Sequence, residues 1–130
     1  MVYDYSRSTW TQLLRCKSNA LQDIKAFIYL IENQFHTKLK TIRSDNDLEF
    51  TSAEATSFFK DKGIIHQRSC PYTPQQNGVV ERKHKYLLER ARSLLFQSKP
   101  PMKYWGECVL TATYLINRLP TKLLQKKVPI

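Results

Sequence analysis

The sequence contains little glycine and cysteine. Only three of its 130 residues are glycine and 42% are hydrophobic, which favours a packed core over a disordered tail and fits one globular domain. The three cysteines, Cys16, Cys70 and Cys108, are far apart and include no Cys-x-x-Cys pair. Their spacing indicates neither a disulfide framework nor a zinc site, so we expect structural thiols in a reducing compartment.

Long apolar runs are absent too. No apolar stretch is long enough to span a bilayer, and no positively charged segment followed by an apolar run stands at the N-terminus. We therefore expect a soluble, intracellular protein with no membrane partner.

Acidic residues are outnumbered by basic ones. The 11 Asp and Glu against 21 Lys and Arg give a net charge of +10 and a pI near 9.7. Such an excess favours a polyanionic partner, and nucleic acid is the first candidate. A basic surface with no particular partner gives the same charge, so the charge alone does not separate the two interpretations.

The pattern of apolar residues predicts alternating strands and helices. β-forming residues on both sides of Ser6-Arg7-Ser8 predict a β-hairpin over Met1 to Leu14. Three- and four-residue spacings predict helices over residues 18–34, 51–62 and 102–117 and from residue 79 onward. Short runs at 39–44 and 64–68 predict strands between helices. The sequence therefore predicts an α/β domain in which Asp45 follows a strand and Glu81 lies in the first turn of a helix.

Asp45 and Glu81 are the two carboxylates that indicate a chemistry. Asp45 is predicted where open α/β sheets bind ligands, and Glu81 shares a helix face with Lys85. Converging carboxylates hold the divalent metals that phosphoryl transfer on a nucleic-acid backbone requires. Both acids also have ordinary structural explanations, because Asp45 before Asn46 is typical of a turn and an acid complements the dipole at a helix start.

Two groups of polar side chains predict contacts with nucleic acid. The loop before the long helix carries the amides of Gln75, Gln76 and Asn77, which can donate to and accept from bases, sugars or phosphates. The long helix carries basic residues that would neutralise phosphates, namely Arg82, Lys83, Lys85, Arg90 and Arg92. A plain polar connection and a solvated basic helix face are the alternatives.

Four phrases resemble the integrase catalytic core of copia-type LTR retrotransposon Pol polyproteins. They are Val2-Tyr3-Asp4-Tyr5-Ser6-Arg7, Ile42-Arg43-Ser44-Asp45-Asn46, Pro71-Tyr72-Thr73-Pro74-Gln75-Gln76-Asn77-Gly78-Val79-Val80-Glu81-Arg82-Lys83 and Ile116-Asn117-Arg118-Leu119-Pro120. The resemblance implies a ribonuclease H-like fold, a mixed five-stranded sheet flanked by helices. It also implies magnesium-dependent processing of element DNA 3′ ends and strand transfer into host DNA, which would place the protein in the nucleus.

The resemblance also implies roles for individual residues. Asp45 matches the family's second catalytic Asp and Glu81 its catalytic Glu, and thirty-five residues separate them. Both would be ligands of Mg²⁺. Gln75, Gln76, Asn77 and Lys85 match positions expected near DNA.

The chain departs from the resembling family at two places. The family's first catalytic Asp lies on a strand before the Tyr-Ser-Arg segment and has no match here, since Asp4 matches an acid that is not catalytic. Asn46-Asp47-Leu48-Glu49 replaces the usual Asn-Gly-Gly-Glu, so we expect a different turn there.

From the first departure we expect residues 1–130 to form one partial core domain that lacks its central strand. Such a domain would be inactive alone and would act with other copies or other integrase segments. The alternatives are a non-catalytic, basic nucleic-acid-binding module and an unfolded remnant.

Overall fold

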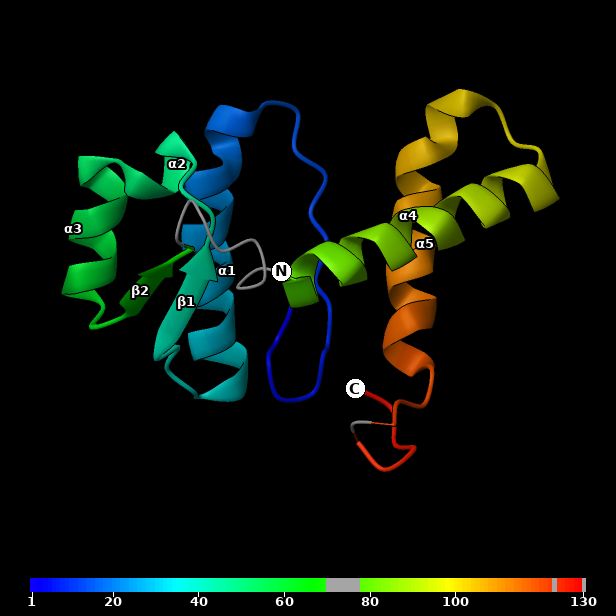
Figure 1. Ribbon diagram of the computed structural model, residues 1–130. Coiled ribbons are helices and arrows are strands. Elements are labelled where there is room, and N and C mark those ends of the chain that lie inside the picture. Colours follow the sequence, from blue (N-terminus) through cyan, green and yellow to red (C-terminus); the bar gives the residue numbers. More distant parts are fainter. Residues whose placement is uncertain (70–77, 123, 130) are drawn as a thin grey trace. The chain divides into compact units, whose positions relative to one another are not determined.

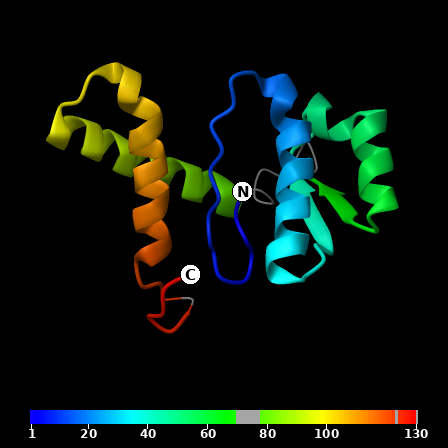
Figure 2. The same ribbon diagram turned by 180° about the vertical axis from the view of Figure 1, so that it is seen from behind.

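The computed structural model describes residues 1–69, 78–122 and 124–129 (Figures 1 and 2). The chain divides into two compact units. One comprises Met1–Leu13 with Gly78–Ile130 and is called the helical unit below. The other comprises Leu14–Asn77 and is called the α/β unit. Each unit has its own hydrophobic cluster.

The α/β unit contains two strands and three α-helices among its described residues. In chain order they are α1 (Ala20–Phe35), β1 (Thr41–Ser44), α2 (Leu48–Thr51), α3 (Ala53–Asp61) and β2 (Ile65–Arg68), with a 3₁₀ turn η1 (Lys17–Asn19) before α1. The strands are parallel, and Thr41 to Ser44 pair in register with Ile65 to Arg68. Helix α1 lies behind β1 in Figure 1 and in front of it in Figure 2, so it covers one face of the sheet.

The core of the α/β unit forms between α1, α3 and the sheet. Its buried residues are Leu21, Ile28, Ala55, Phe59 and Ile64. Helix α3 begins at a side-chain cap, because Ser52 Oγ accepts the Ala55 N–H at 3.2 Å. It ends before Gly63, whose φ of +66° places it in the left-handed region that glycine adopts without strain. Helix α3 therefore lies within the predicted range of residues 51–62, whose first residue belongs to α2.

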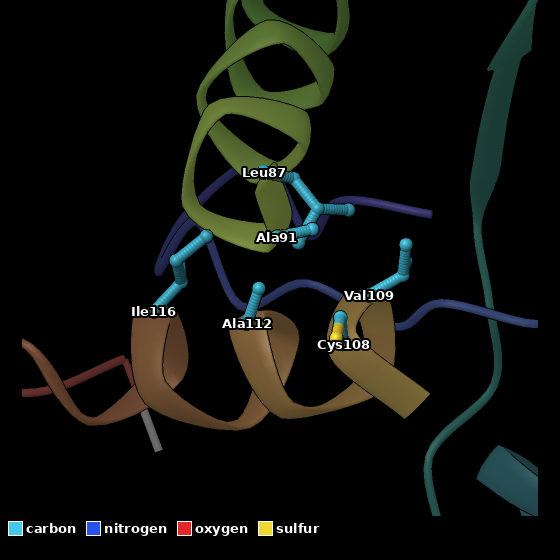
Figure 3. Packing of buried hydrophobic residues seen from close by; sticks show 6 residues of the cluster. All are labelled: Leu87, Ala91, Cys108, Val109, Ala112 and Ile116. Carbon is cyan, nitrogen blue, oxygen red and sulfur yellow. The ribbon is translucent and has the colours of Figure 1, made fainter. Parts of the chain in front are cut away.

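The helical unit is built on two crossing helices. They are α4 (Gly78–Ser98) and α5 (Trp105–Arg118), with a 3₁₀ turn η3 (Met102–Tyr104) before α5. Figure 3 shows Leu87 and Ala91 of α4 pointing toward the buried residues of α5, which are Cys108, Val109, Ala112 and Ile116. Ala91 and Ala112 are both 0% exposed, and such small side chains allow the two helices to approach closely.

The segment Met1–Leu13 packs against α5 through polar groups. Asn117 Oδ1 accepts the Thr9 N–H at 2.8 Å, and Asn117 Nδ2 donates to the Thr9 carbonyl at 2.7 Å. Thr9 is 5% exposed and Asn117 6% exposed. The Thr11 and Thr113 hydroxyls add a bond of 2.8 Å. A side chain of α5 therefore satisfies backbone groups of a segment more than a hundred positions away.

The predicted β-hairpin over Met1 to Leu14 is wrong in its extent. The described segment holds one antiparallel bridge, between Val2 and Thr9, and no strand. The two sides bond through the Tyr3 N–H to the Ser8 carbonyl and the Trp10 N–H to the Met1 carbonyl. A two-stranded hairpin is marginal alone, and here the Thr9 backbone bonds to Asn117 in place of a neighbouring strand.

One finer expectation also needs correction. The described residues form a parallel pair of strands instead of the mixed sheet that the resemblance implied. At the start of α4, Val80 is 48% exposed, because the buried stripe of this helix runs through Leu87 and Ala91.

No helix in the described parts of the chain is long and apolar enough to cross a membrane.

Candidate metal and nucleic-acid sites

Asp45 stands directly after β1, at the carboxyl end of the parallel pair, with an exposed side chain. Its Oδ1 accepts the Asp47 N–H at 3.3 Å, a local contact that turns the chain from the strand toward α2. The next residue, Asn46, donates from Nδ2 to the Ser69 carbonyl at 2.7 Å and so joins the ends of both strands. Asp45 therefore stabilises the turn after β1, and its carboxylate still lies at the edge of the sheet where ligands bind.

The turn after Asp45 forms without left-handed backbone angles. Asp47 has a φ of −59°, and Leu48 already begins α2. Lys17 Nζ lies 2.7 Å from Asp47 Oδ2 and 4.0 Å from Glu49 Oε2. The hydrogen bond to Asp47, with the charges of Asp47, Glu49 and Asp45, raises the pKa of Lys17. Asp47 is thus paired with Lys17. Asp45 takes part in no ion pair among the described residues.

His66 and Ser44 connect the two strands beside Asp45. Ser44 Oγ and His66 Nε2 are 2.8 Å apart, and the His66 ring centroid is 4.9 Å from that of Phe59 in the core. Burial, followed by the charge of Arg68, lowers the pKa of His66 below its ordinary value. The neutral imidazole is therefore the form that the folded α/β unit favours.

The lowered pKa of His66 predicts a pH-dependent stability. Because the folded state binds this proton less well than the unfolded chain, its contribution is fully present above an unfolded pKa of about 6.5 and is lost as pH falls through the folded pKa. Urea unfolding followed by circular dichroism should therefore show a larger loss of stability on acidification for the natural chain than for His66→Gln, which cannot titrate. Equal losses would contradict this assignment.

Glu81 lies in the first turn of α4, with Lys85 one turn further on, and both side chains are exposed. Their spacing places them on the same helix face. Within the described ranges neither residue takes part in an ion pair. The acid and the base are both available to a ligand.

The described residues do not complete a metal site. Asp45 belongs to the α/β unit and Glu81 to the helical unit. Across residues 1–69, 78–122 and 124–129 no group of three His, Cys, Asp or Glu could hold a metal ion. Carboxylate oxygens are the ligands that Mg²⁺ prefers, so Asp45 and Glu81 fit the ion in chemistry. Two carboxylates are fewer than the three groups that such a site needs.

The remaining predicted residues fall into two groups. Arg82 and Lys85 are exposed on α4, and Lys83 is partly buried on the same helix. Gln75, Gln76 and Asn77 lie outside the described residues.

Two residues that lie beside the predicted basic residues of α4 were not themselves predicted. Arg7 and Tyr86 line a hollow together with Arg82 and Lys83. For Tyr86 the signal was available, because it follows Arg82 by four positions and so shares its helix face. For Arg7 no local signal exists, since the other residues that line the hollow are more than seventy positions away in the sequence.

The sequence matches segments of transposon polyproteins, while no protein-family model matches it. It is 42% identical over 126 residues to the retrovirus-related Pol polyprotein from transposon TNT 1-94 of Nicotiana tabacum, covering 97% of this chain and 10% of that protein. It is 41% identical over 125 residues to the Pol polyprotein from transposon RE1 of Arabidopsis thaliana, covering 96% and 8%. The chain therefore spans about a tenth of the length of these relatives.

Solved structures of viral proteins share the fold. The catalytic core domain of BIV integrase has a TM-score of 0.69 and 26% identity, and the match covers 98% of this chain and 78% of that one. The HTLV-2 integrase catalytic core domain in complex with magnesium has a TM-score of 0.71 and 21% identity over the same shares. A simian T-cell lymphotropic virus intasome in complex with PP2A regulatory subunit B56 gamma has a TM-score of 0.74 and 23% identity, covering 98% and 44%.

Proposed function

We propose that this chain, which is related to the integrase catalytic core region of copia-type retrotransposon Pol polyproteins, acts in DNA integration. The relationship itself confirms the resemblance that four phrases of the sequence carried. The proposed reactions are processing of element DNA 3′ ends and strand transfer into host DNA, in the nucleus. Agreement between the polyprotein matches and the integrase-core fold is the observation that carries this proposal.

Asp45 and Glu81 are the proposed metal ligands. Both are exposed acids without an ion pair in the described part of the chain, one at the carboxyl end of β1 and one at the start of α4. Bound Mg²⁺ would neutralise the charge that develops on the attacking and leaving oxygens. Lys85, one turn after Glu81, would hold a neighbouring phosphate.

A third carboxylate is needed to complete the proposed site. We propose that residues 1–130 form part of one core domain and that the missing acid comes from a further integrase segment or another copy of the protein. The 130-residue chain alone is then expected to give no turnover.

DNA is the proposed partner. Arg82, Lys83 and Lys85 would contact phosphates, and the amides of Gln75, Gln76 and Asn77 would contact the DNA beside them. The net charge of +10 supports this binding whether or not the chain catalyses a reaction.

The affinity of the chain for duplex DNA is expected to fall steeply with salt. Each neutralised phosphate contributes about 0.9 to the slope of log affinity against log salt, so about six contacts would give a slope near −5. Fluorescence anisotropy with a labelled duplex between roughly 50 and 200 mM salt measures this slope.

A charge-matched pair of variants tests which residues bind DNA. Replacing Arg82, Lys83 and Lys85 together by Gln should reduce the slope by about 0.9 for each phosphate contact that is lost. Replacing the exposed Lys38, Lys60 and Lys126 by Gln removes the same charge elsewhere and should change the slope less. A flat salt dependence of the natural chain would contradict DNA binding.

A further inference from the structure

A hollow of about 290 Å³ in the helical unit is lined by three cations. Arg7 comes from the N-terminal segment, and Arg82 and Lys83 come from the first turns of α4. Val79 and Tyr86 complete the lining. No carboxylate is among these lining residues, although each of the three basic groups would normally attract one.

The hollow adjoins the face of α4 that carries Glu81 and Lys85. Its four α4 residues are three, four or seven positions apart along the helix, except for the adjacent pair Arg82 and Lys83, and so share one face. Arg82 follows Glu81 directly, which rotates it by about 100° around the helix axis. Arg82 also lies three positions before Lys85, so the hollow borders the face on which we place the metal ligand.

The cations in this hollow repel one another and the end of the helix. Arg7, Arg82 and Lys83 line the same hollow, so their positive charges lie close together. A Cβ built on Gly78 would lie 3.2 Å from Arg82 Nη1, so the guanidinium lies against the start of α4. That end carries a partial positive charge from the helix dipole.

Only one of the three cations has a carboxylate partner. Arg7 pairs with the exposed Asp4, whereas Arg82 and Lys83 have no ion pair within the described ranges. A bound anion would relieve the repulsion among all three.

The lining selects the kind of anion. Guanidinium groups bind phosphate oxygens in a bidentate manner, and a lysine ammonium adds a compact charge. The remaining wall consists of the Val79 side chain and Tyr86, whose ring lies 4.9 Å from the Arg90 guanidinium carbon. The lining offers charge to an oxyanion and apolar surface to the group attached to it.

We propose that Arg7, Arg82 and Lys83 bind a backbone phosphate of DNA in this hollow, as an anchor beside the Glu81 and Lys85 face. The inference rests on the proposed function, since it names where one phosphate of that DNA is held. Contacts to phosphate position a duplex without reading its sequence. The anchor would therefore act equally on element DNA and host DNA.

Removal of Arg7 should weaken DNA binding by one phosphate contact. In Arg7→Gln the salt slope is expected to fall by about 0.9, and Arg82→Gln should give the same loss. Arg118→Gln removes one charge from the same unit outside the hollow and should leave the slope unchanged. If the salt slope fell equally in all three variants, Arg7 and Arg82 would not form a specific phosphate anchor.

Inorganic phosphate tests the hollow independently of DNA. With ¹³C-labelled lysine, NMR spectra should show that phosphate shifts the Lys83 side-chain resonance in the natural chain and not in Arg82→Gln. Phosphate binding together with an unchanged DNA slope in Arg7→Gln would mean that the hollow takes free phosphate, which overturns the DNA anchor. If the natural chain binds no DNA while phosphate still shifts this resonance, the proposed function fails and the anion site remains. No response of Lys83 to phosphate would overturn the site itself.

Discussion

Replacing Glu81 by Gln is expected to reduce magnesium-dependent strand transfer at least about 100-fold in a polypeptide that joins this chain to a segment carrying the third carboxylate. Loss of a residue that merely supports a metal ligand typically costs 10–100-fold, and loss of a ligand should cost more. Gln keeps the size of Glu81 and removes the negative charge that would hold Mg²⁺. Asp45→Asn is expected to have the same effect for the same reason.

The experiment needs a joined polypeptide and matched controls. The segment that precedes the matched region in the tobacco polyprotein can be fused before Met1, and strand transfer of a labelled duplex into plasmid DNA measured with Mg²⁺. Glu89→Gln makes the same substitution on an exposed residue of α4 and should retain activity. Asp47→Asn changes an acid that is paired with Lys17 and should also retain activity.

Two outcomes would contradict these roles. A fused protein that keeps its strand transfer after Glu81→Gln would remove Glu81 from the metal site. Strand transfer by the 130-residue chain alone, if Glu81→Gln abolished it, would overturn the proposal that the chain needs a further carboxylate.

The sequence predicted those helices and strands that depend on interactions between residues close together in the chain. Helix α3 lies within the predicted range of residues 51–62, because the cap at Ser52 and the left-handed Gly63 that bound it act within a few positions. The short strands β1 and β2 also lie within the predicted runs. Asp45 could be placed at the end of β1 for this reason.

Interactions between distant segments were not predictable in the same way. The phrase containing Asn117 supported the resemblance, yet nothing near it in the sequence shows that its amide bonds to Thr9. The hairpin prediction failed for a related reason, since β-forming residues specify a strand only when a neighbour pairs with it. Among the described residues, Thr9 is bonded to a helix side chain instead. Likewise Arg7 reaches Arg82 and Lys83 only through the fold.

Asn117→Ala is expected to destabilise the helical unit by about 2–4 kcal/mol. The substitution leaves the buried N–H and carbonyl of Thr9 without the partners that Asn117 provides at 2.8 and 2.7 Å. A buried group left unsatisfied costs about 1–3 kcal/mol, and two are affected here. Trp10 and Trp105 both belong to this unit, so tryptophan fluorescence during urea unfolding reports its free energy of unfolding.

Two further variants separate the hydrogen bonds from a general effect of substitution. Gln97→Ala removes an exposed amide from the same unit and should change the free energy of unfolding by less than about 0.5 kcal/mol. Asn117→Asp keeps an acceptor for the Thr9 N–H but loses the donor and buries a charge, so its stability should recover as pH falls and the carboxyl becomes protonated. If Asn117→Ala were as stable as Gln97→Ala, the Asn117 amide would not hold the N-terminal segment on α5. Arg7 would then lack the support that keeps it beside α4, and the phosphate anchor would lose its structural basis.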